Sequence, residues 1–203
     1  MGKLVVTSFV SLDGVMQAPG GPDEDRSGGF AHGGWIIGLG DEGFGQTMVD
    51  IFSRPAAFLL GRGTFDIFEG YWPKQTSANH PIASKLNALP KYVVSKTRTS
   101  SDWKPTTFLG DIDAVRTLKT KIDGELQVHG SPRLSEALFA AKLVDEWHMV
   151  QAPVILGSGK KLFEGKGTAQ AMKITRTVTT PNGITIRTYV PNGDVVQGDA
   201  TKM

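Results

Sequence analysis

Two short turns in this chain carry the residue types that bind phosphate, each between an expected strand and an expected helix. In one of them, Gly130-Ser131-Pro132 follows a short apolar run and precedes apolar residues at helical spacing. Pro132 suits the first position of a helix, and Ser131 suits the cap before it. Backbone N–H groups and the positive end of a helix dipole converge at such a turn, so it predicts a phosphate site.

The other turn is Gly61-Arg62-Gly63-Thr64, which follows the apolar residues 56–60. Gly61 permits close approach of the backbone, and Thr64 can either cap the next helix or hold a phosphate oxygen. The planar guanidinium of Arg62 matches a phosphate, although a cation is unfavourable at a helix start unless an anion lies nearby. We therefore predict that the two bends lie side by side and together bind a dinucleotide.

Side-chain chemistry is otherwise sparse. No motif supplies a nucleophile with its base, the four histidines show no metal-ligand spacing, and cysteine is absent. The sequence therefore predicts neither a metal site nor thiolate chemistry. This pattern suits a protein in which a bound cofactor carries the chemistry and the protein supplies binding and orientation.

The elements around the turns predict an α/β domain. Residues 124–163 follow a strand, turn, helix and strand pattern, and such a unit forces a parallel pair of strands. Further strands are expected over residues 3–10, 56–60, 91–95 and 106–109, and helices over 41–53, 80–89 and 111–122. Asn182-Gly183 separates two alternating runs, which is typical of an antiparallel hairpin.

Composition limits the class of protein. The 203 residues, with 39% hydrophobic and 21% charged residues, predict one domain over residues 1–190 and a polar tail over 191–203. The net charge of +2 has no basic stripe, which argues against nucleic acid as a partner. No apolar leader or membrane-length run is found, so we expect no membrane association. The absence of cysteine is compatible with a cytoplasmic protein.

Six sequence words resemble the dihydrofolate reductase-like superfamily, and more closely the reductase domain of bacterial riboflavin biosynthesis. They are TSFVSLDGVM, FLLGRGTFDIF, KYVVSKT, HGSPRL, LVDEWHM and PVILGSGKKLF, and the resemblance extends over residues 3–189. It implies a three-layer α/β/α fold with a mostly parallel sheet of about eight strands that ends in an antiparallel hairpin. It also implies a homodimer that pairs through residues 144–163.

The resemblance implies an oxidoreductase, namely an NADPH-dependent reductase of a small pyrimidine or pterin, similar to 5-amino-6-(5-phosphoribosylamino)uracil reductase. No deaminase domain precedes it, so a stand-alone reductase domain is expected. Two alternatives stay open: a dihydrofolate or pteridine reductase proper, and a protein that binds a nucleotide without turnover. A second glycine loop covers residues 153–163, and its Lys160 and Lys161 are candidates to contact a phosphorylated substrate.

The resemblance also assigns residues to the cofactor. Arg62 would read the ribose 2′-phosphate, Ser95, Lys96 and Arg98 would flank the adenosine ribose, and Asp13-Gly14 would pass under the nicotinamide unless they form an ordinary turn. The loop over residues 17–34 would close over the active site, or be a plain surface loop. The expected cofactor-binding residues are Asp13, Gly14, Gly61, Arg62, Thr64, Ser95, Lys96, Arg98, Gly130, Ser131, Arg133 and Leu134.

The expected acid is less well placed. In dihydrofolate reductases the helix before the glycine-arginine strand carries the carboxylate that assists protonation of the substrate. The equivalent place here is near Gly45, which is not an acid, and the candidate catalytic residues Asp41 and Glu42 lie one turn away. Both have a second explanation, because acidic residues complement the dipole in a first helical turn.

Overall fold

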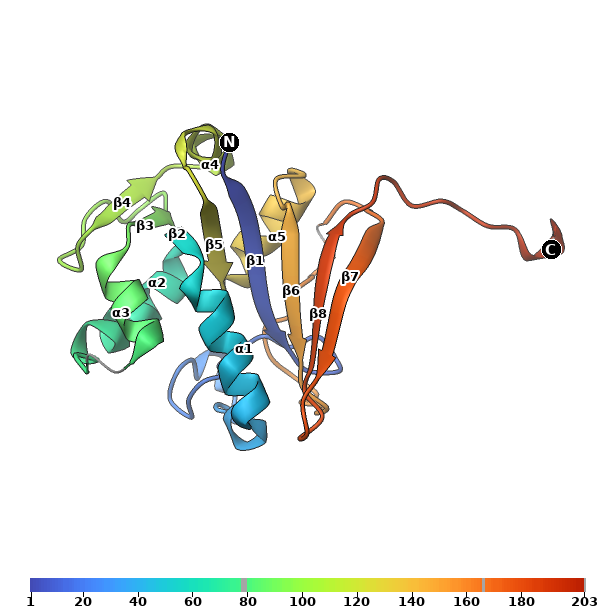
Figure 1. Cartoon of the computed structure of the whole chain (residues 1–203), viewed down its shortest axis with the longest axis horizontal. Helices are drawn as coiled ribbons and strands as arrows, with labels where there is room; N and C mark the ends of the chain where they lie inside the picture. Colours follow the sequence, from blue (N-terminus) through green and yellow to red (C-terminus); the bar gives the residue numbers. More distant parts are fainter. Residues whose placement is uncertain (78–79, 166, 203) are drawn as a thin grey trace.

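The computed structural model, which describes residues 1–77, 80–165 and 167–202, is built around one eight-stranded sheet in the order β4-β3-β2-β5-β1-β6-β8-β7 (Figure 1). Strands β1 to β6 run parallel, and β8 pairs antiparallel with both β6 and β7. The strands are β1 (Lys3–Val10), β2 (Pro55–Gly61), β3 (Lys91–Val94), β4 (Thr106–Leu109), β5 (Glu125–His129), β6 (Glu146–Gln151), β7 (Met172–Thr179) and β8 (Thr185–Pro191).

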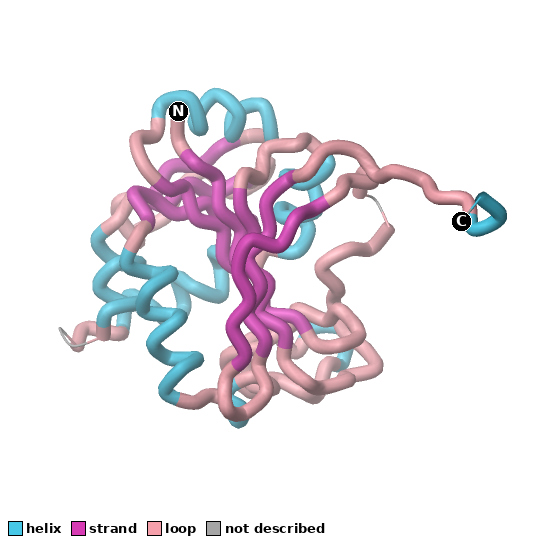
Figure 2. Tube along the Cα trace, turned by 45° about the vertical axis from the view of Figure 1, so that its right-hand side comes forward, coloured by secondary structure: helices cyan, strands magenta, loops and turns pink. Residues whose placement is uncertain are grey.

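Helices cover both faces of the sheet (Figure 2). Helices α1 (Glu42–Ser53), α2 (Arg62–Tyr71) and α3 (Pro81–Ala88) bury Phe52, Phe65 and Leu86 with Phe58 and Leu60 of β2. Helices α4 (Ile112–Lys121) and α5 (Pro132–Ala140) pack on the opposite face. Four short 3₁₀ turns are η1 (Ser27–Gly29), η2 (Ile37–Leu39), η3 (Trp72–Lys74) and η4 (Ala200–Lys202).

The central strands read as unbroken apolar runs because both of their faces are covered. In β1, Leu4, Val5 and Val6 are fully buried, although their side chains alternate between the two faces. This arrangement confirms the predicted fold class: three layers, a mostly parallel sheet of eight strands and a terminal antiparallel hairpin.

The ends of the chain and of its elements follow simple local chemistry. The helix expected from Asp41 begins one residue later, because the Asp41 side chain accepts the bond from Phe44 N and acts as its cap. The hairpin turn closes as expected, with Gly183 at φ +85°.

After β8 the chain leaves the body as a tail (Figure 1), whose last residue, 203, lies outside the described residues. None of the described helices has both the length and the apolar character needed to cross a bilayer.

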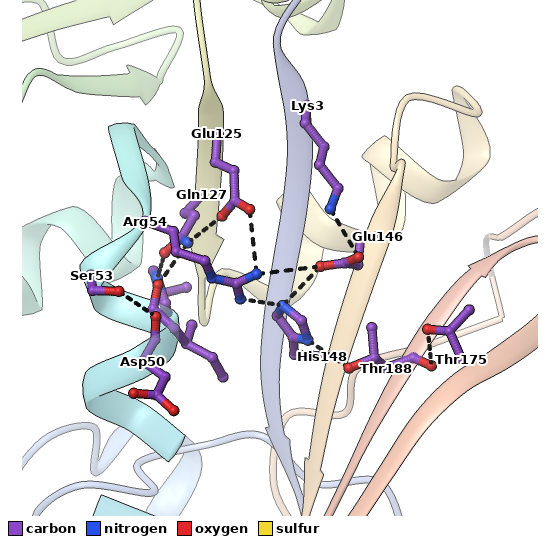
Figure 3. A network of polar contacts seen from close by, with 12 residues as sticks. Lys3, Asp50, Ser53, Arg54, Glu125, Gln127, Glu146, His148, Thr175 and Thr188 are labelled. Carbon is purple, nitrogen blue, oxygen red and sulfur yellow. Dashed lines mark hydrogen bonds and ion pairs between the residues drawn. The ribbon is translucent and has the colours of Figure 1, made fainter. Parts of the chain in front are cut away.

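A polar network lies on the face of the sheet under α1 (Figure 3). Arg54, which follows α1, lies 3.4 Å from the carboxylate of Glu125 on β5 and 3.9 Å from that of Glu146 on β6. Lys3 on β1 contacts Glu146 at 2.9 Å. Because both cations are partly exposed, these ion pairs contribute little stability on their own and mainly fix where the side chains lie.

Two histidines of this face are buried and neutral. Gln127 donates both amide hydrogens, to the backbone oxygen of Ile51 at 2.9 Å and to Glu125 at 2.7 Å. The remaining amide oxygen faces Nε2 of His129 at 3.0 Å, so that nitrogen carries the hydrogen and donates it. Burial, with a smaller contribution from His148, lowers the pKa of His129 to about 3. Burial also lowers the pKa of His148.

These histidines predict a loss of stability in weak acid. In the unfolded chain a histidine has a pKa of about 6.5 and takes up a proton below it, whereas the folded chain excludes that proton. The contribution of these neutral histidines to the free energy of unfolding is therefore fully present above about pH 6.5 and is lost as the pH is lowered towards 3. We expect urea titrations to give a falling free energy of unfolding between these limits, and His129→Asn to flatten part of the fall. An identical pH dependence in wild type and variant would contradict the assignment.

Candidate functional site

The two glycine bends predicted to bind phosphate are joined by two hydrogen bonds. They follow β2 and β5, which are neighbours in the sheet. Gly61 N donates to Oγ of Ser131, and Ser131 N donates to Oγ1 of Thr64, both at 2.9 Å. A Cβ atom on Gly61 would lie 3.4 Å from Ser131, and one on Gly130 would lie 3.3 Å from Thr64. The predicted adjacency is therefore confirmed, and the φ of +61° together with the close contact favours glycine at Gly130.

The predicted capping bond of Ser131 is wrong. Ser131 is the N-cap of α5 by position, at φ +54°, but its side chain makes no cap bond. The reason is that its hydroxyl accepts the Gly61 N–H across the bend. Thr64 does not cap α2 either, because it is the third residue of that helix and Gly61 is the N-cap.

Helices α2 and α5 therefore begin without a capping side chain. The other three helices differ, because Asp41, His80 and Asp111 cap α1, α3 and α4. The first N–H groups of a helix have no partner within it, and they carry about half a positive charge. Two uncapped helix starts lying side by side present N–H groups that suit an anion. Thr64 accepts one bond and retains its O–H for donation.

The structure distinguishes the two arginines predicted to bind cofactor. Arg62 donates to Oγ1 of Thr97 at 3.0 Å and lies 3.4 Å from Asp66, with 55% of its side chain exposed. Arg98 instead contacts Asp66 at 2.6 Å and Glu69 at 2.7 Å. Two carboxylates neutralise Arg98, so it stabilises the loop after β3, whereas Arg62 stays accessible at the start of α2.

The turn after β3 lies next to Arg62 through Thr97. Oγ of Ser95 accepts from Arg98 N at 2.9 Å and from Thr97 N at 3.3 Å, which shapes the turn, and Lys96 is exposed. The structure thus brings Arg62, Ser95 and Lys96 to one place, as expected for residues around a phosphate.

Sequence reasoning missed both partners of Arg62. Asp66 could have been found, because it follows Arg62 by four residues in a helix and such pairs meet on one face. Thr97 comes from another strand end and gives no local sign.

The two remaining residues expected beside the cofactor, on α5, lie differently. Arg133 is exposed, whereas Leu134 is only 7% exposed and belongs to the main core. Cβ of Leu134 lies 3.5 Å from where a Cβ of Gly61 would be, so this side chain packs against the neighbouring bend. What Leu134 can offer a ligand is its backbone N–H in the first turn of α5.

Asp13 fastens the second glycine loop to the end of β1. Its carboxylate accepts from Oγ of Ser11 at 2.6 Å, Leu156 N at 3.1 Å and Gly157 N at 2.9 Å. The Ser11 bond, followed by the backbone bonds, lowers the pKa of Asp13 to about 2. Gly14 supplies the φ of +82° that the tight turn requires. The Asp13 side chain is therefore occupied, and any contact of this segment with a ligand is left to its backbone.

The loop over residues 17–34 is held to the second glycine loop. The amide of Gln17 donates to the backbone oxygens of Asp25 and Ser27, and its oxygen accepts from Lys160 N. The Lys160 ammonium contacts Asp25 at 2.5 Å. The charge of Lys160 is thus paired within the protein, and its predicted contact with a phosphorylated substrate stays a prediction.

The candidate acids gain no support from their positions. Asp41 accepts from Phe44 N and Asn182 N, and these bonds lower its pKa, so it holds no proton to give. Glu42 and Gly45 are exposed on α1. No group of three or more His, Asp or Glu side chains within residues 1–77, 80–165 and 167–202 is arranged to bind a metal.

Comparison with known proteins agrees with this architecture. The chain is 26% identical over 195 residues to the uncharacterized protein YyaP of Bacillus subtilis, covering 94% of this chain and 96% of that one.

Three solved structures share the fold. A putative riboflavin biosynthesis protein from Shewanella has a TM-score of 0.66 at 20% identity, covering 94% and 99% of the two chains. A pyrimidine reductase-like protein from Corynebacterium diphtheriae has 0.59 at 14%, covering 95% and 92%. Dihydrofolate reductase from Enterococcus faecalis, complexed with NADP(H) and RAB-propyl, has a TM-score of 0.60 at 12% identity, covering 94% and 96%.

The decisive match is to a family model. Residues 2–186, nearly the whole sheet with both phosphate-type bends, match the model of the RibD C-terminal domain. The chain belongs to the RibD C-terminal domain family and shares its fold with dihydrofolate reductase.

Proposed function

We propose that this protein is an NADPH-dependent reductase of a pyrimidine or pterin substrate, similar to the uracil-derivative reductase of riboflavin biosynthesis. The observation that carries the proposal is the pair of uncapped helix starts at Gly61 and Ser131, joined side by side. The NADP(H) complex of the Enterococcus dihydrofolate reductase and the name of the Corynebacterium pyrimidine reductase-like protein support it.

The protein's own contribution is binding and orientation. The first turns of α2 and α5 hold the pyrophosphate on N–H groups, and Arg62 meets the 2′-phosphate. Bound NADPH would supply the hydride. Arg62 and Lys96 are exposed cations, so the adenosine end of the site would favour a cofactor that carries the negatively charged 2′-phosphate. Orientation of two reactants in one site can contribute about 7–11 kcal/mol to lowering a barrier.

One observation favours a second candidate, a protein that binds a nucleotide without turnover. Neither Asp41 nor Glu42 is placed to donate a proton to a substrate on the sheet. The exposed Gly45 also argues against a dihydrofolate reductase proper. Turnover assays separate these possibilities.

Arg62→Ala tests the 2′-phosphate contact. Loss of a charge-assisted bond of about 1.5–3 kcal/mol should weaken NADPH binding about ten- to a hundredfold. NADH lacks that phosphate, so its Kd should change little. Calorimetric titration with both cofactors measures the difference, and Arg116→Ala, on α4, is the control. Equal losses for NADPH and NADH would remove this role from Arg62.

Gly63→Asp tests the helix start itself. A Cβ on Gly63 meets nothing within 4 Å, so the fold accommodates the change. An aspartate in a first turn stabilises a helix by about 0.3–1 kcal/mol, yet it repels a phosphate bound there. We expect an unchanged or higher Tm together with NADPH binding weakened about tenfold. Gly63→Ala, which adds no charge, is the matched control, and tight NADPH binding by both variants would contradict the site.

The reaction is tested by NADPH consumption on a panel of pyrimidines and pterins, followed at 340 nm. The proposal expects at least one pyrimidine or pterin to be reduced, with rates that fall in Arg62→Ala at low NADPH. Binding of NADPH without consumption on the whole panel would favour the second candidate. Failure to bind NADPH would end the proposal.

A further inference from the structure

Polar side chains form one buried row across four strands under α1. Thr7 of β1 is in register with His129 of β5 on one side and with His148 of β6 on the other. His148 is in register with Thr188 of β8. Residues opposite one another on neighbouring strands face the same side of a sheet. The four residues are almost completely buried, with Thr7 at 0% and His129 at 2% exposure.

The half of this row formed by His148 and Thr188 is hydrogen-bonded within the protein. Nδ1 of His148 lies 3.1 Å from Oγ1 of Thr188, and Nε2 of His148 lies 3.0 Å from Arg54 (Figure 3). The half formed by Thr7 and His129 has one unpaired polar atom on each residue. Oγ1 of Thr7 and Nδ1 of His129 have no hydrogen-bond partner among the described residues. Buried polar atoms are almost always paired in folded proteins. Five buried side-chain atoms of the described residues lack a partner, and these two, which are in register on adjacent strands, point to a ligand.

The character of the two atoms follows from their surroundings. Nε2 of His129 donates to Gln127, whose amide nitrogen is committed to two other acceptors. Nδ1 is therefore a bare acceptor that requires a donor from elsewhere. The Thr7 hydroxyl is free to donate. The row thus offers an acceptor and a donor on adjacent strands, which lie about 4.8 Å apart.

The pair lies next to the proposed cofactor site. His129 ends β5 and directly precedes the Gly130 bend, and Thr7 lies three residues before the end of β1. The Phe52 ring of α1 stacks on the His129 imidazole, with ring centres 4.1 Å apart. Phe52 covers the face of the imidazole, so a ligand reaches Nδ1 along the ring edge. Because both residues are buried, α1 must move outward to admit it.

We propose that Thr7 and His129 form the substrate subsite of this protein and read the lactam edge of a flat heterocycle. The ring N–H of the lactam donates to Nδ1 of His129, and its carbonyl accepts from the Thr7 hydroxyl. The inference rests on the proposed reductase function for the nature of the substrate. It assigns recognition on this face to two neutral groups, in place of the carboxylate expected on α1.

The test compares two small probes by calorimetric titration of the full chain saturated with NADP⁺. The first is 5,6-diaminouracil, which has lactam edges, and the second is 2,4-dimethoxypyrimidine, which has none. Wild type should bind the first about tenfold more tightly, since each of the two hydrogen bonds contributes about threefold. Thr7→Val and His129→Leu each remove one of these bonds and should each reduce that preference to about threefold.

Matched variants separate recognition from folding. Thr7→Ser keeps the hydroxyl, and His129→Asn places an amide oxygen near the position of Nδ1, so both should retain the preference. Thr7→Val should not lower the Tm, because it removes a hydroxyl that bonds to nothing within the described chain. Retained preference in Thr7→Val and His129→Leu, or no preference in wild type, would overturn the subsite.

The two proposals can fail separately. If NADPH binds and is consumed but the preference is unaffected by these variants, the subsite is wrong and the reductase stands. If no NADPH binds while the preference exists in wild type and is lost in Thr7→Val, the subsite stands and the reductase falls. For the latter comparison the probes are also titrated without NADP⁺.

Discussion

The structure depends on a reciprocal exchange of hydrogen bonds between two neighbouring bends. The Ser131 hydroxyl accepts a hydrogen bond from Gly61 N, and Ser131 N donates one to the hydroxyl of Thr64. Each side chain satisfies the backbone of the other bend, so neither is left to cap its own helix. The consequence is electrostatic: two helix starts face the same edge of the sheet with their first N–H groups uncommitted. A single pair of hydrogen bonds therefore links the bends that follow β2 and β5 and leaves two helix starts whose N–H groups suit an anion.

The other loops at this edge are held by charged side chains that are already paired with groups of the protein itself. Asp13 binds the second glycine loop, Asp41 caps α1 and reaches the hairpin turn at Asn182, and Lys160 pairs with Asp25. Arg98 is neutralised by Asp66 and Glu69. Arg62 stands out because its partners, Thr97 and Asp66, leave it half exposed. The charged groups near the bends thus divide into those paired within the protein and those, such as Arg62 and Lys96, that stay exposed.

The fold and the bends could be predicted from the sequence because they follow from local patterns. Apolar runs gave the strands, Asn182-Gly183 gave the hairpin, and glycine after a strand gave the two bends. The roles of individual polar side chains could not, since they depend on partners from distant segments. Ser131 is a residue type that favours capping, but its hydroxyl accepts from Gly61 N of another bend. Asp13 and Asp41 accept from backbone N–H groups of residues 156–157 and 182. The homodimer stays a prediction.

The face under α1 shows why long-range register matters for function. The alternation of β5 places Gln127 and His129 on one side, but only its pairing with β1 brings His129 beside Thr7. Gln127 then fixes the tautomer of His129 by spending both amide hydrogens elsewhere. His129 thus becomes a fixed acceptor beside the Thr7 hydroxyl. A neutral acceptor and donor of this kind select a ligand by its hydrogen-bond pattern, where a carboxylate would select by charge, and this would suit a substrate that enters the site uncharged.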